Sequence, residues 1–177
     1  GRIWRVTFKG TSPVEKKDFT KATIDELLAS LTSKETVHRE KARSEIRTRD
    51  RAEVLPKLTA WSSKLTDEFS LMQAMWTHQA INDTANELIK TLAASSDPRF
   101  RAAALRVIYH RHEELPEASA IVKKAITDSN ARVRLWAVSC LAQMPGPDSV
   151  PTALQALALP MDNTLDFALW SLVREHE

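Results

Sequence analysis

An alanine returns about every 31 residues along this chain, and this period constrains the fold more than any other feature. Each of these alanines lies in the middle of the second of two short helical patterns. A small residue at one fixed point of every second helix lets neighbouring helices pack closely. A period of this length built from two helices is typical of an α-solenoid. The repeated positions, spaced by 32, 30, 33 and 31 residues, are Ala42, Ala74, Ala104, Ala137 and Ala168.

The composition agrees with a helical chain. Only three of 177 residues are glycine, which leaves few tight turns of the kind that β-sandwiches and barrels need. About ten short helical patterns are joined by short breaks, and such short connections force consecutive helices into antiparallel pairs. We therefore predict an all-α fold for residues 18–177, an α-α superhelix of about five helical hairpins. Residues 1–17 are predicted to form an extended arm or linker.

Two of the repeats match each other closely. The segment "SSDPRFRAAAL" aligns with "TDSNARVRLWAV" at an offset of 33, so that Arg99 falls on Arg132 and Arg101 on Arg134. An arginine pattern of this kind after a polar turn resembles HEAT repeats of the armadillo-like class. The motifs of tetratricopeptide and ankyrin repeats are missing. The resemblance implies a protein-interaction scaffold, with a concave partner surface lined by the second helix of each hairpin.

The first ten residues, "GRIWRVTFKG", differ from the rest, because "IWRVTF" has the β-branched and aromatic composition of a strand. Together with "SLMQAMWTHQAI" and "DNTLDFALWSLVREHE", this stretch resembles large exported dehydrogenase-like proteins of Planctomycetes, Verrucomicrobia and Bacteroidetes. In that family a β-propeller similar to quinoprotein sugar dehydrogenases precedes a HEAT-repeat segment, and a haem-binding domain often follows. Residues 1–17 would then hold the last strand of the propeller.

This second resemblance implies a periplasmic or secreted parent protein whose chemistry lies outside these residues. The haem-attachment pattern CxxCH is missing, and we expect no cofactor, metal or catalytic residue in this segment. Its partners would be other proteins or neighbouring domains of the same chain, and we expect neither nucleic acid nor a small molecule. The alternative is a free-standing HEAT-repeat protein that binds another protein or, as further options, nucleic acid or a tetrapyrrole.

Arginines are the first candidates for partner binding. Arg39, Arg101 and Arg134 occupy one position of the repeat, where the other two repeats have Leu71 and Leu165. They could form a basic ladder for an acidic partner, or they could tie neighbouring repeats together through carboxylates and carbonyls. Arg43 belongs to the mixed-charge stretch "HREKARSEIRTRDR", a pattern that usually marks a solvated helix face.

Tryptophans are the second candidates. Trp76 and Trp170 each follow the aligned alanine by two residues. They could pack inside the repeats or be exposed docking anchors on the concave face, since tryptophan and arginine dominate binding hot spots.

Other chemistry finds little support in the sequence. The single cysteine, Cys140, lies in an apolar helical pattern and is expected to be a buried thiol. His110 and His112 are two residues apart and so point away from each other on a helix. The net charge of +2 gives no general argument for nucleic acid. The sequence holds no run of 18 apolar residues that would span a membrane.

Overall fold

The computed structural model describes Trp4, Gly10 and residues 14–175, and the regular structure of this part is entirely helical. The predicted extended arm falls mostly on residues outside this part. The described helices are α1 (Ile24–Ser30), α2 (Thr36–Ile46), α3 (Arg51–Ser62), α4 (Glu68–Ala80), α5 (Asn86–Ala93), α6 (Pro98–Arg111), α7 (Ala118–Ala125), α8 (Ala131–Gln143), α9 (Ser149–Leu154) and α10 (Asn163–Glu175), with 3₁₀ helices η1 (His112–Glu114) and η2 (Gln155–Ala158).

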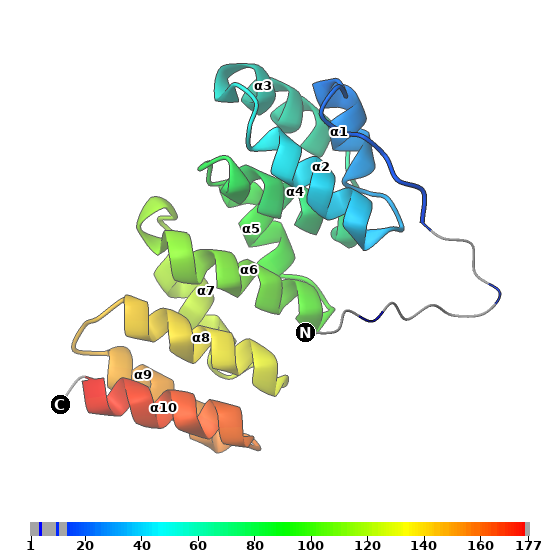
Figure 1. The fold of residues 1–177 in the computed structure, drawn as a ribbon. Helices are drawn as coiled ribbons and strands as arrows, with labels where there is room; N and C mark the ends of the chain where they lie inside the picture. The colour runs from blue at the N-terminus through cyan, green and yellow to red at the C-terminus, as the bar shows by residue number, and fades with distance from the viewer. Residues whose placement is uncertain (1–3, 5–9, 11–13, 176–177) are drawn as a thin grey trace.

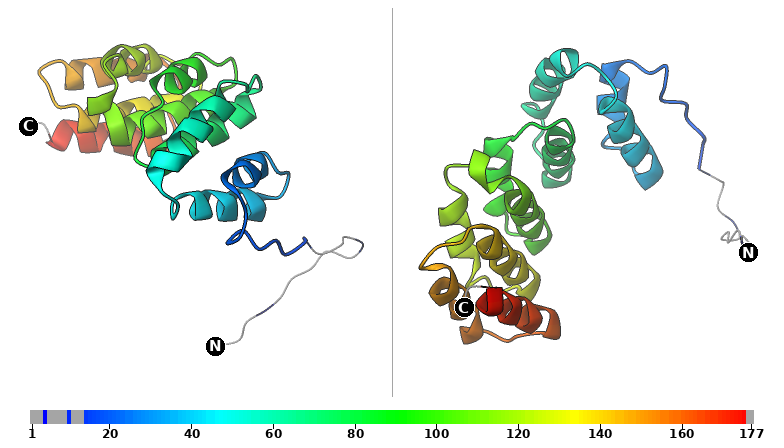
Figure 2. Two further views of the ribbon diagram at one scale, coloured as in Figure 1. Left: turned by 90° about the horizontal axis from the view of Figure 1, so that it is seen from above. Right: turned by 60° about the vertical axis from the view of Figure 1, so that its left-hand side comes forward.

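The ten α-helices pair into five antiparallel hairpins that stack one on another, as predicted (Figure 1). The second helices, α2, α4, α6, α8 and α10, follow one another in a row, and the closest packing between hairpins joins α6 to α8 and α8 to α10. The stack is curved, and these second helices lie on its inner side (Figure 2, right). The prediction of an α-solenoid is confirmed.

Polar caps start the last four second helices and define the repeat register. Asp67 accepts a hydrogen bond from the N–H of Ser70, and Asp97 accepts one from Arg99. Asn130 Oδ1 accepts from the N–H groups of Arg132 and Val133, and Asp162 Oδ1 from those of Thr164 and Leu165. Caps of this type satisfy backbone donors that have no partner inside the helix.

The cap register corrects the alignment of the last repeat. Counting seven residues from the caps gives Ala74, Ala104 and Ala137 and then Leu169, so Ala168 is not the equivalent residue. The arginine position, four residues after the cap, holds Asp166 rather than Leu165 in the last hairpin. The alignment by alanine was wrong here, because the caps Asn130 and Asp162 are 32 residues apart, whereas Ala137 and Ala168 are 31 residues apart.

The core consists of two groups of buried side chains. The smaller group belongs to the first two hairpins and includes Leu28, Ile46 and Leu58. The larger group runs from α4 to α10 and includes Leu105, Val133 and Cys140. Cys140 is fully buried and its thiol donates to the carbonyl of Leu105 at 3.2 Å. The expectation of a buried structural thiol is therefore confirmed.

One proline lies inside a helix. Pro56 is the sixth residue of α3, which begins at Arg51. Pro56 is therefore in the helix interior, where it cannot donate to the carbonyl of Ala52.

Candidate functional site

Two arginines of the repeated position, Arg101 and Arg134, donate to acceptors at the boundaries between hairpins. Arg101 donates from Nε and Nη2 to the two carboxylate oxygens of Asp128, at 2.7 and 2.8 Å, and from Nη1 to the carbonyls of Ser95 and Ser96. Asp128 belongs to the next hairpin, so this ion pair joins two repeats. A bidentate, charge-assisted pair of this kind is among the stronger polar contacts available to a protein.

Arg134 is only 1% exposed. Its guanidinium donates to the carbonyls of Asp128 and Ser129 at 2.6 and 3.1 Å, and to the carbonyl of Pro160 in the following hairpin. The geometry of Arg101 and Arg134 supports the interpretation that these arginines tie repeats together, and Arg134 has almost no surface to offer a partner.

Arg39 and Arg43 on α2 are partly exposed and each lies over an aromatic ring of α4. The guanidinium carbon of Arg39 is 5.3 Å from the centroid of Phe69, and that of Arg43 is 5.8 Å from the centroid of Trp76. Arg43 also donates hydrogen bonds to the side-chain oxygens of Glu40 and Gln73. Cation–π contacts of this length add modestly to stability at exposed positions.

Trp76 lines a groove on the inner side of the curved stack. The groove has a volume of about 270 Å³ and a floor of two alanines, and arginine and tryptophan side chains form its walls. Arg106 lies 6.0 Å from the ring centroid of Trp136. Neither α6 nor α8 carries an acidic residue, so the groove combines aromatic surface with positive charge. Its lining residues are Met72, Trp76, Arg99, Ala102, Ala103, Arg106, Arg132 and Trp136.

Trp170 lies elsewhere, on the end face of the last hairpin. The position eight residues after the cap holds Met75, Leu105 and Val138 in the preceding second helices, each 1% exposed, and Trp170 in α10, which is 54% exposed. A position that is buried between hairpins elsewhere is therefore exposed in α10, because no further hairpin covers α10 in the part of the chain that the structure describes. The sequence left open whether Trp170 packs inside the repeats or is exposed on the concave face, and the cap register places it on the end face instead.

The last hairpin carries further exposed apolar side chains that the sequence analysis did not single out. The exposed large hydrophobic residues of the last hairpin are Leu154, Leu157, Phe167 and Trp170. Phe167 stacks on Trp170 with ring centroids 5.9 Å apart.

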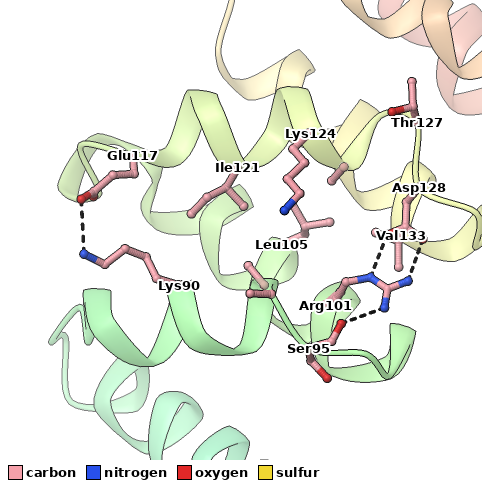
Figure 3. A pocket seen from close by; sticks show the side chains of 13 residues that line it. Lys90, Ser95, Arg101, Leu105, Glu117, Ile121, Lys124, Thr127, Asp128 and Val133 are labelled. Atoms are coloured by element: carbon pink, nitrogen blue, oxygen red, sulfur yellow. Dashed lines mark hydrogen bonds and ion pairs between the residues drawn. The ribbon is translucent and has the colours of Figure 1, made fainter.

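A hollow of about 540 Å³ opens between α5 and α7 (Figure 3). The Arg101–Asp128 pair closes one end, and Lys90 reaches Glu117 at 3.3 Å at the other end. Burial raises the pKa of Asp128, but the hydrogen bonds from Arg101 and from the N–H of Asn130 outweigh that effect and leave the pKa below its ordinary value. Asp128 is therefore a carboxylate at neutral pH.

The described residues offer no group of histidine, cysteine and acidic side chains that could hold a metal ion. Burial raises the pKa of the Cys140 thiol to about 12, so this thiol is a poor nucleophile at neutral pH. Among the described helices, none is both long and apolar enough to cross a membrane.

The family model of HEAT repeats matches residues 85–172. This range covers α5 to α9 and most of α10, including both inter-repeat arginines. No curated protein and no solved structure matches the chain significantly. HEAT repeats generally mediate interactions and are typically non-catalytic. The stacked hairpins, the arginine ties and the matched range together identify this part of the chain as a HEAT-repeat segment.

Proposed function

We propose that this chain is a non-catalytic interaction and connecting module whose last hairpin docks against another layer of protein. One observation carries the proposal: the register position that buries Met75, Leu105 and Val138 against the following hairpin holds the exposed Trp170. A repeat array that ends in solvent needs a polar outer face, whereas the last described hairpin presents Trp170 stacked on Phe167. Exposed aromatic side chains are typical of interaction sites, where tryptophan is enriched.

The groove on the inner side supplies a second contact surface. Arg106 and Arg132 are exposed and neither is in an ion pair with any described residue, while Trp76 and Trp136 provide apolar surface between them. Its charge suits an acidic segment of a partner, because complementary charge accelerates encounter and fixes register. Of the six residues predicted for partner binding, Trp76 lines this groove, Arg43 lies over the ring of Trp76, and Trp170 lies on the end face.

We further propose that the segment belongs to a larger exported dehydrogenase-like protein, periplasmic or secreted, in which it connects a propeller to its neighbours. The support is the resemblance of "GRIWRVTFKG" and of the two helical motifs. The solenoid would hold the oxidising unit and its electron acceptor at a fixed distance. The alternative remains a free-standing HEAT-repeat protein with a separate protein partner.

Photo-cross-linking in the source cells tests the docking surface. A photoreactive phenylalanine analogue at position 170 or 157 is expected to give light-dependent adducts that map to one helical segment. The same analogue at Thr59, an exposed position on α3, serves as the control and should give none. If positions 170 and 157 cross-link no more than position 59, the end face is not a docking surface.

The size of the native protein tests the parent chain. An antibody raised to this segment should detect a band well above the mass of 177 residues. A band at the mass of this chain would overturn the proposal of a dehydrogenase-like parent. It would leave the docking surface to be explained by a separate partner.

A further inference from the structure

The hollow between α5 and α7 arises from how these two hairpins stack. The second helices α6 and α8 pack closely, whereas α5 and α7 share almost no close backbone contact. Small residues, Ala93, Ala94 and Ala125, occupy part of the walls and leave the space between the helices open. The hollow of about 540 Å³ lies within the size range of small-molecule sites.

The floor of the hollow is apolar and rigidly held. Leu105 of α6 and Val133 of α8 belong to the buried core and form its bottom, and Ile121 of α7 adds to one wall (Figure 3). Apolar atoms of a ligand that enters would therefore move from water onto preformed apolar surface. This transfer favours binding in proportion to the apolar area that is buried.

The charges at the hollow do not cancel. Three cationic side chains and two carboxylates line it. Asp128 is neutralised by Arg101, and Glu117 by Lys90. The third cation, Lys124, makes no hydrogen bond or ion pair with any residue that the structure describes. Figure 3 shows its amino group directed over the hollow toward Leu105. One uncompensated positive charge thus stands beside apolar surface.

We propose that this hollow binds an amphipathic monocarboxylate, a single carboxylate on an unbranched apolar chain. The carboxylate pairs with the amino group of Lys124, and the chain lies on Leu105, Ile121 and Val133. A cationic amphiphile of the same length meets repulsion from Lys124, and a neutral one lacks the ion pair. The inference is independent of the docking surfaces described above, since it involves neither Trp170 nor the inner groove.

Isothermal titration calorimetry with decanoate, below the concentration at which it forms micelles, tests the site. Decanoate is expected to bind with one-to-one stoichiometry, and decyltrimethylammonium is expected not to bind. Octanoate, shorter by two methylene groups, should bind about 15-fold more weakly if both groups are buried, at about 0.8 kcal/mol for each. Equal binding of the anion and the cation, or a stoichiometry well above one, would overturn the proposal.

Two neighbouring lysines give a matched pair of variants. Lys124→Gln should weaken decanoate binding at least about tenfold, because it removes the cation of the hollow that has no ion-pair partner among the described residues. Lys123→Gln removes the same charge one residue away, on the side of α7 that faces α9, and should leave binding unchanged. Equal effects of the two variants would show that decanoate responds only to net charge, which contradicts a defined site.

A third variant fills the hollow without touching its charge. Ala94 is exposed at the end of α5 and lines the hollow, so Ala94→Leu should fold normally by circular dichroism. Its larger side chain is expected to occupy the space of the ligand chain and to abolish decanoate binding. Unchanged affinity in this folded variant would overturn the proposal. So would the absence of detectable binding to the unaltered protein at 1 mM decanoate, a concentration at which a Kd of 1 mM corresponds to a binding free energy of about 4 kcal/mol.

Discussion

At the scale of single residues, the same side chain does different work according to its place in the register. Arg101 and Arg134, four residues after their caps, donate their hydrogen bonds to carboxylate and carbonyl acceptors within the stack. Arg106 and Arg132 face the groove and make no ion pair among the described residues. An arginine can therefore be assigned to structure or to binding only by the direction in which its helix position points.

Replacing Arg134 by alanine is expected to lower the free energy of unfolding by about 3 kcal/mol. The substitution leaves three carbonyl oxygens at a repeat boundary without a donor, and buried unpaired acceptors are costly. Arg132→Ala, two residues away and exposed, should change the free energy of unfolding by no more than about 0.5 kcal/mol. Urea denaturation followed by circular dichroism measures both. Similar losses in the two variants would contradict a structural role specific to Arg134.

The Arg101–Asp128 pair predicts how stability depends on pH. The pKa of Asp128 is lower in the folded chain than its ordinary value, so its contribution is fully present above the unfolded pKa of about 4. This contribution is lost as the pH falls through the lower folded pKa. Asp128→Asn should therefore be less stable than the unaltered protein at pH 7, and the difference should shrink at pH 3. A difference that grows toward pH 3 would contradict this assignment.

At the scale of elements, polar caps and short breaks determine most of the helix boundaries. Thr23 and Glu26 form a reciprocal capping box at the start of α1, a pattern that can be recognised in the sequence. Helix α3 follows the same rule but contains a proline. Asp50 caps α3 directly before Arg51, which leaves Pro56 in the helix interior.

Replacing Pro56 by alanine is expected to raise the free energy of unfolding by about 2 kcal/mol. Alanine restores an N–H donor toward the carbonyl of Ala52 and removes the clash of the ring, at a partial cost from a more flexible unfolded chain. Thr59→Ala, exposed on the same helix, is the control and should have an effect within about 0.5 kcal/mol. The midpoint of urea denaturation reports both effects. Destabilisation by Pro56→Ala would mean that packing needs the backbone geometry that Pro56 imposes on α3.

At the scale of the whole molecule, the solenoid has two cores rather than one. The groups of buried side chains around Leu28 and around Leu105 are separate. A polar contact joins the first two hairpins, in which Arg43 of α2 donates to the side-chain oxygen of Gln73 on α4. Because each repeat contacts only its neighbours, stability is expected to be local rather than global.

Hydrogen exchange should therefore respond to core mutations by region. Leu28→Ala, which removes buried atoms from the smaller core, is expected to cost about 3 kcal/mol locally and to accelerate exchange in α1 to α3. Exchange in α6 and α8 should stay unchanged. Ile108→Ala in the larger core is the matched variant and should give the opposite pattern. Mass spectrometry of exchanged peptides measures both, and a uniform acceleration in either variant would indicate a single cooperative unit.

The repeat period, the helical pairs, the HEAT-type arginines and the buried Cys140 could all be predicted from the sequence. Each depends on local pattern: a small residue at a fixed position, short breaks, and polar turns before apolar helices. The strand-like opening stretch and its implied propeller stay predictions, since most of residues 1–17 lie outside the described part of the chain.

Only the tertiary structure decided which surfaces are open. The caps showed that Trp170 occupies the position of the buried Val138, which the alanine alignment missed by one residue; one residue turns a helix position by about 100°. The hollow beside Lys124 could not be predicted either, because its walls come from α5, α6, α7 and α8 and its existence depends on how far α5 and α7 diverge. Sequence pattern determines which way a side chain faces on its own helix, whereas packing between helices determines whether anything covers it.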